Sequence, residues 1–123
     1  MHNLKTVDLK AFVPAKDFEL SKRFYQDFGF TMASDEDGIA FFHHGNCRFL
    51  LQDFYQEQHA NNFMMHLLVK EVTPWHRHLK EAGLAEKYGI EISDIVRQPW
   101  MMLDFTVTDP SGVLWRIAEN LEL

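Results

Sequence analysis

The side chains of this chain that could do chemistry include seven histidines, and their spacing limits what they can do together. His43 and His44 are adjacent in an expected strand, so their side chains point to opposite faces. His76 and His78 are two residues apart in an expected helix and also diverge. Neither pair can therefore hold one metal ion, and we expect most of the histidines to be surface residues or hydrogen-bonded core residues.

Cys47 is the only cysteine, which excludes a disulfide within the chain and favours a reducing compartment. No Cys–His–acid arrangement is evident, so we expect a small buried thiol rather than a nucleophile. The segment 1–5 has no apolar signal core, and no run approaches the ~20 apolar residues of a membrane span. We therefore predict a cytoplasmic protein without a membrane partner.

Charge and composition narrow the class of partner. The formal net charge of −6 argues against nucleic acid, because phosphates require a basic face, and it suits a cationic ligand. Hydrophobic residues make up 46% of the 123 residues and include 11 Phe, which is enough for a packed core. We expect one domain that spans residues 1–123.

Two halves with the same plan are expected to position the polar side chains. In the first half, alternating apolar residues predict a strand over 4–13. Asp17 is a helix cap, and apolar residues at helical spacing predict a helix that ends at Gly29. Three short strands are then expected around 31–33, 39–43 and 47–53.

The second half repeats this order after a polar linker over 56–62. A strand is expected over 63–69, and Pro74 opens a helix that runs to about Ala82, with a connector over 84–89. Strands follow around 90–96, 100–108 and 113–119. Each half is therefore strand–helix–strand–strand–strand, in modules of about 1–55 and 62–123, which is an α+β fold.

The last hairpin carries a family resemblance. The turn Asp109-Pro110-Ser111-Gly112 lies between two alternating apolar strands. Together with the opening Val13-Pro14-Ala15-Lys16-Asp17-Phe18, it resembles the glyoxalase/bleomycin-resistance/ring-cleaving dioxygenase superfamily, the vicinal oxygen chelate fold, and most of all its bleomycin-resistance-type members. The resemblance implies two βαβββ modules whose sheets curl around a central cleft.

The resemblance also implies where metal-dependent relatives place their ligands: a His in the first strand of each half and a Glu in the last. Here those positions are Asp8 and Met64, and Phe49 and Arg116. An anion, a thioether, an aromatic ring and a cation do not form a site for a hard metal ion. We therefore predict no metal and no cofactor, and we expect Asp8 and Arg116 to form an ion pair.

A relocated metal site stays open as an alternative. By strand alternation, His66 shares a face with Met64, and Asp104 shares a face with Met102. Asp8, His66 and Asp104 would then offer a metal ion three nitrogen or oxygen ligands, although these residues lie at different positions along their strands.

The candidate ligand-binding residues combine aromatic and apolar side chains with scattered polar groups. They are Asp8, Phe12, Phe49, Met64, His66, Trp100, Met102, Asp104 and Arg116. Such a lining suits noncovalent capture of a bulky, partly aromatic molecule. Of the three tryptophans, we expect Trp75 and Trp115 to pack in the interior and Trp100 to line the groove.

The predicted function is therefore a metal-independent small-molecule-binding protein, without catalytic residues, that sequesters its ligand as bleomycin-resistance proteins do. The resemblance also implies a homodimer with grooves between protomers. Two alternatives remain: a glyoxalase-like lyase, isomerase or dioxygenase with a relocated metal, and a dimerisation domain without a small ligand.

Overall fold

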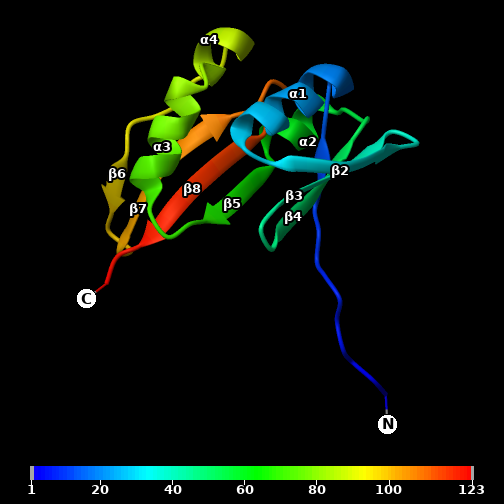
Figure 1. Cartoon of the computed structure of the whole chain (residues 1–123), viewed down its shortest axis with the longest axis horizontal. Helices are drawn as coiled ribbons and strands as arrows, with labels where there is room; N and C mark the ends of the chain where they lie inside the picture. Colours follow the sequence, from blue (N-terminus) through cyan, green and yellow to red (C-terminus); the bar gives the residue numbers. More distant parts are fainter. Residues whose placement is uncertain (1, 123) are drawn as a thin grey trace.

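The computed structural model describes residues 2–122 and arranges them in two four-stranded sheets with helices (Figure 1). The elements follow the chain in this order: β1 (Phe12–Pro14), α1 (Phe18–Phe28), β2 (Thr31–Glu36), β3 (Ile39–His44), β4 (Cys47–Gln52), α2 (Glu57–Asn61), β5 (Met64–Leu68), α3 (Val72–Glu81), α4 (Leu84–Tyr88), β6 (Val96–Gln98), β7 (Met102–Thr108) and β8 (Leu114–Asn120).

Each half of the chain builds one sheet with the same topology. Sheet A has the order β1-β4-β3-β2, and sheet B has the order β5-β8-β7-β6. In both sheets the first strand pairs in parallel with the last strand of its half, and the other pairs are antiparallel. The predicted α+β fold of two strand–helix–strand–strand–strand modules is confirmed.

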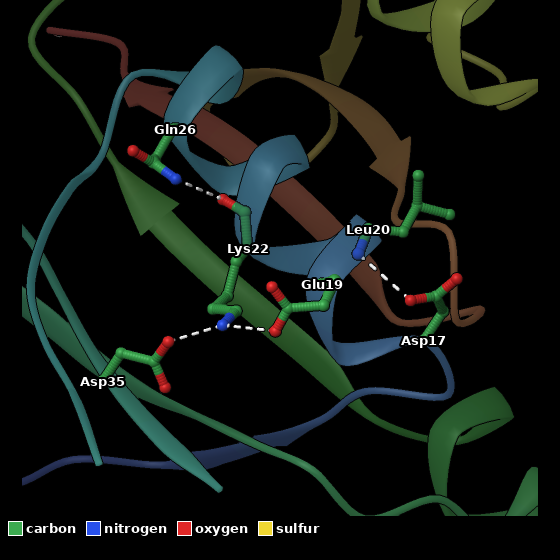
Figure 2. Close-up of polar contacts among 6 residues, drawn as sticks. All are labelled: Asp17, Glu19, Leu20, Lys22, Gln26 and Asp35. Atoms are coloured by element: carbon green, nitrogen blue, oxygen red, sulfur yellow. Dashed lines mark hydrogen bonds and ion pairs between the residues drawn. The ribbon is translucent and has the colours of Figure 1, made fainter.

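Helix α1 begins and docks as its local sequence dictates (Figure 2). The Asp17 side chain accepts a hydrogen bond from the Leu20 backbone N–H at 3.1 Å and so caps the N-terminus. On the next turn, the Lys22 ammonium contacts both Glu19 and Asp35, which ties the helix to β2. These carboxylates raise the pKa of Lys22, with the hydrogen bond to Asp35 as the largest cause.

The apolar face of α1 lies in one aromatic core that both sheets share. The ring of Tyr25 is 4.9 Å from Phe49 of sheet A and 5.5 Å from Trp115 of sheet B, centroid to centroid. Trp115 is buried and Trp75 packs against Phe28, as predicted for these two tryptophans. Because the same rings fill both modules, neither sheet buries its inner face alone.

A buried hydrogen-bond network joins the Asp-Pro-x-Gly hairpin to this core. The Tyr25 hydroxyl donates to Asp109 and accepts from Trp115 Nε1 at 2.8 Å. The other Asp109 oxygen accepts from the backbone N–H groups of Ser111 and Val113, both at 2.9 Å. Gly112 has φ +97°, and an added Cβ would lie 2.7 Å from Asn61 Oδ1. The hairpin therefore requires glycine there.

The structure differs from the sequence prediction in three segments. The predicted strand over 4–13 is confined to Phe12–Pro14. The parallel ladder with β4 begins where Leu50 N–H donates to Ala11 O at 3.0 Å, and residues 2–10 have no strand pairing among the described residues. The predicted strand over 90–96 is a single bridge from Ile92 to Val107, followed by β6. The linker 56–62 and the connector 84–89 each contain a short helix, α2 and α4. Among residues 2–122, no helix has the length and apolar character required to cross a bilayer.

Candidate functional site

Strand alternation gives sheet B one face that packs in the core and one that the helices leave uncovered. On β8, Trp115 and Ile117 are buried in the core, and Arg116 lies between them on the opposite face. On β7, Phe105 and Val107 pack inward in the same way. We call the opposite side the open face of sheet B, formed by Met64, His66, Leu68, Met102, Asp104, Thr106, Leu114, Arg116 and Ala118.

A charged pair lies in the middle of the open face. Arg116 Nη1 donates to Asp104 Oδ2 at 2.9 Å, and Gln98 Nε2 donates to Asp104 Oδ1 at 2.9 Å. Asp104 is only 2% exposed, so this carboxylate depends on its two partners in place of water. Gln98 was not among the predicted site residues, although β6 pairs it with Met102 next to the open face.

The predicted ion pair between Asp8 and Arg116 is wrong. Asp8 contacts Lys10 Nζ at 3.3 Å and Arg48 Nη1 at 3.2 Å, both on the sheet A side of the molecule. The backbone N–H of Leu9, with these two cations, holds the pKa of the Asp8 carboxyl below its usual value. The prediction placed Arg116 on the correct face. It missed Asp104 as the partner, because the sequence does not indicate that Asp104 lies on the adjacent strand within hydrogen-bond distance of Arg116.

The donors of the open face do not fit a divalent metal ion. Asp104 is neutralised by Arg116, and Asp8 is held at sheet A by two cations, which leaves His66 without either carboxylate. Within residues 2–122, no three His, Cys, Asp or Glu side chains converge on one point. A guanidinium next to the only buried carboxylate of this face would also repel a cation.

Phe49 is in the core and not on a ligand-binding face, which corrects a second prediction. It is 1% exposed and stacks on Phe42 with ring centroids 5.3 Å apart. The first paired residue of the last strand lies two residues after the turn glycine in both hairpins, Cys47 in β4 and Leu114 in β8. The two strands nevertheless begin on opposite faces, because the odd-numbered residues of each strand, such as Phe49 and Trp115, pack in the core. The same count from the glycine therefore reaches the core in one module and the open face in the other.

Of the remaining predicted residues, Met102 is half-buried and the others are exposed. Trp100 is 57% exposed in the turn between β6 and β7, next to Met101 with φ +62°. Met64 is 55% exposed on the open face, and His66 lies two residues further along β5. Phe12 lies on sheet A, where it is paired with Leu50. The structure therefore places Met64, His66, Met102, Asp104 and Arg116 on one face of sheet B, with Met64 and Met102 at opposite ends of β8. Trp100 lies beyond the Met102 end, and Asp8 and Phe12 lie on the side of sheet A.

The described surface cavities lie beside residues other than those of the predicted site. Cavities of about 390 to 640 Å³ among residues 2–122 are lined by none of the predicted site residues. The cavity of about 390 Å³, for example, is lined by Gly29, His44, Pro74, Trp75 and His78. Cys47 is also exposed and not buried as expected, because it is the first residue after a tight turn.

Comparison with known proteins agrees with this architecture. The family model described as Glyoxalase/Bleomycin resistance protein/Dioxygenase superfamily matches residues 8–117. Comparison with curated protein sequences gives no significant match.

Three solved structures illustrate the likeness of fold. A bleomycin-binding protein in complex with bleomycin is 22% identical, with a TM-score of 0.80 over 94% of this chain and 99% of that chain. An antibiotic-binding protein from Streptomyces sp. CB03234 is 19% identical, with a TM-score of 0.77 over 97% of this chain and 99% of that one. A lactoylglutathione lyase from Agrobacterium tumefaciens is 17% identical, with a TM-score of 0.67 over 95% of this chain and 96% of that one.

Proposed function

The chain belongs to the glyoxalase/bleomycin resistance protein/dioxygenase superfamily, and we propose that it binds a bulky, partly aromatic small molecule on the open face of sheet B without chemical change. The observation that carries this proposal is the composition of that face. Apolar side chains surround a partly buried ion pair, Arg116–Asp104, and an exposed tryptophan lies at one end. Apolar area with a few fixed polar groups is the usual lining of a ligand site.

An antibiotic is the ligand class that we propose. One protein of similar fold is solved in complex with bleomycin, and a second is described as an antibiotic-binding protein. The net charge of −6 suits a cationic ligand such as this glycopeptide. The exposed indole of Trp100 offers a ring on which a planar group can stack.

Binding in this proposal needs no resident metal. The lyase and dioxygenase reactions of the superfamily would require a divalent ion to hold vicinal oxygen atoms, and the open face offers such an ion only His66 and a neutralised Asp104. A sequestering protein requires only affinity. We also propose a reducing, cytoplasmic location, in which the exposed Cys47 stays a thiol.

A homodimer is part of the same proposal. The open face is a half-exposed sheet surface with no opposing wall in one chain, whereas a tight ligand site buries most of its ligand. A second copy would supply the opposite wall of the groove. Exposed apolar faces of this kind also favour association.

Calorimetric titration with metal-free bleomycin tests the function. We expect saturable binding with a dissociation constant in the micromolar range or tighter. The Trp100→Ala variant should weaken binding by about fivefold, because a stacked ring contributes on the order of 1 kcal/mol. Phe54→Ala is the matched control, since Phe54 is 46% exposed but lies outside the open face. Equal affinity of both variants, or no heat of binding for the unaltered chain, would contradict the proposed site or ligand.

A further inference from the structure

A cavity of about 390 Å³ lies where the two modules meet, and none of its lining residues belongs to the open face of sheet B. Gly29 and His44 line it from the first module, and Pro74, Trp75 and His78 line it from α3. A second cavity of about 480 Å³ shares three of these residues and continues between the β3–β4 hairpin and the β5–α3 connection (Figure 1). Volumes of this size are typical of small-molecule sites.

Three rings surround the smaller cavity. The indole of Trp75 is half-buried and packs against Phe28, with ring centroids 6.2 Å apart. The imidazoles of His44 and His78 lie at 72° and 88° to the indole plane, with centroid distances of 5.0 and 6.4 Å. The two histidine rings therefore form walls beside the indole and do not stack on it. An indole that borders a cavity in this way attracts cations through its ring electrons.

The backbone determines which nitrogen of each histidine carries a hydrogen. His44 Nδ1 lies 3.1 Å from Gly29 O, and His78 Nε2 lies 3.1 Å from Phe28 O. A carbonyl oxygen only accepts hydrogen bonds, so both of these nitrogens are donors. In the neutral rings, His44 Nε2 and His78 Nδ1 are then acceptors, and neither has a hydrogen-bond partner among residues 2–122. Both histidines can therefore accept a hydrogen bond from a ligand.

The C-terminal end of α1 gives the cavity a partial negative charge. Phe28 is the last residue of this helix, Gly29 follows it, and the last turn contains no basic residue. The carbonyl end of a helix stabilises cations nearby. A Cβ added to Gly29 would lie 3.7 Å from Trp75 Cζ3 and 3.9 Å from Cη2, atoms of the six-membered ring that are remote from the Nε1–H donor. Around Gly29, the lining residues therefore present acceptors, partial negative charge and an aromatic ring.

We propose that this cavity is a second ligand site, which binds a small organic cation with N–H donors, such as an amidinium or guanidinium group. The planar cation lies against the indole of Trp75 and donates hydrogen bonds to the free nitrogens of His44 and His78. The net charge of −6 favours such a ligand further. Lys70 and Glu71 line the neighbouring cavity, where their opposite charges offset each other. The site lies outside the open face and goes beyond the proposed function.

Three probes of the same shape test the charge of the ligand. Benzamidine is cationic, benzamide is neutral and benzoate is anionic. The indole N–H signals of the protein are followed by NMR, and the Trp75→Phe and Trp100→Phe variants assign them. Benzamidine should shift the Trp75 signal to saturation with a dissociation constant of about 1 mM or tighter. Benzamide should bind at least about fivefold more weakly, and benzoate should bind more weakly still.

Two lysine variants test the position of the site. His44→Lys removes an acceptor and adds a cation beside the indole, at an exposed position that accepts a longer side chain. It should weaken benzamidine binding by at least about fivefold. His43→Lys is the matched control, because the adjacent residue of β3 points to the opposite face and adds the same charge outside the cavity. It should change the affinity by less than about twofold.

The Trp75 signal decides the outcome. A signal that does not move with benzamidine, moves as much with benzoate, or titrates with the same affinity in both lysine variants would overturn the proposal. Bleomycin is titrated separately and followed at the Trp100 signal, which reports on the open face. The proposed function and the second site can therefore fail independently of each other.

Discussion

The Arg116→Met substitution should destabilise the protein through the carboxylate that it leaves behind. Asp104 has a side chain that is 3% exposed, and its Oδ2 has Arg116 as its only side-chain partner among residues 2–122. Removing one member of a buried ion pair costs about 3–5 kcal/mol, because the other charge stays buried without compensation. The Arg116 side chain is itself 27% exposed, and Gln98 still donates to Oδ1, so we expect about 3 kcal/mol.

A double-mutant cycle separates this effect from loss of packing. In Asp104→Asn/Arg116→Met, the neutral amide still accepts from Gln98 and no charge is buried. The double variant should therefore recover on the order of 2 kcal/mol relative to the sum of the single variants. Asp8→Asn combined with Arg116→Met is the matched control. Asp8 contacts Lys10 and Arg48, so these two changes should be additive within about 0.5 kcal/mol.

Urea unfolding followed by circular dichroism measures all of these free energies at one pH. A cost of less than about 1 kcal/mol for Arg116→Met, or coupling of Arg116 to Asp8 and not to Asp104, would contradict the predicted role of the Arg116–Asp104 pair.

The remaining predictions concern the core and the metal. Tyr25→Phe should lower the free energy of unfolding by about 2–4 kcal/mol, because Asp109 loses a donor and Trp115 Nε1 loses its acceptor in the buried core. Thermal or urea unfolding measures this change, and a loss below about 1 kcal/mol would show that the network contributes little to stability. Burial raises the pKa of Asp109 in the folded protein, so its contribution favours the fold below the unfolded pKa and is lost as the pH rises through the folded pKa. Asp109→Asn should accordingly flatten this part of the stability profile, and an unchanged profile would contradict the assignment. Elemental analysis after gentle purification should find no stoichiometric Zn, Ni, Mn or Fe, whereas about one ion per chain would restore the relocated-metal alternative.

Local patterns account for the features that the sequence predicts correctly. Helix α1 follows from the Asp17 cap, the apolar spacing and Gly29, all of which act within one or two turns. The faces of β8 follow from alternation, so Trp115 is in the core and Arg116 is on the open face. The repeat of the two modules follows from the same local order of elements.

The errors arise where a prediction needs to know which strand lies beside which. Asp104 and Arg116 approach each other only through the pairing of β7 with β8, which no pattern within either strand contains. Phe49 was assigned by counting from a glycine, but the same count reaches the core in β4 and the open face in β8. Alternation over 4–13 predicted a strand, but a strand forms only where a neighbour offers backbone partners.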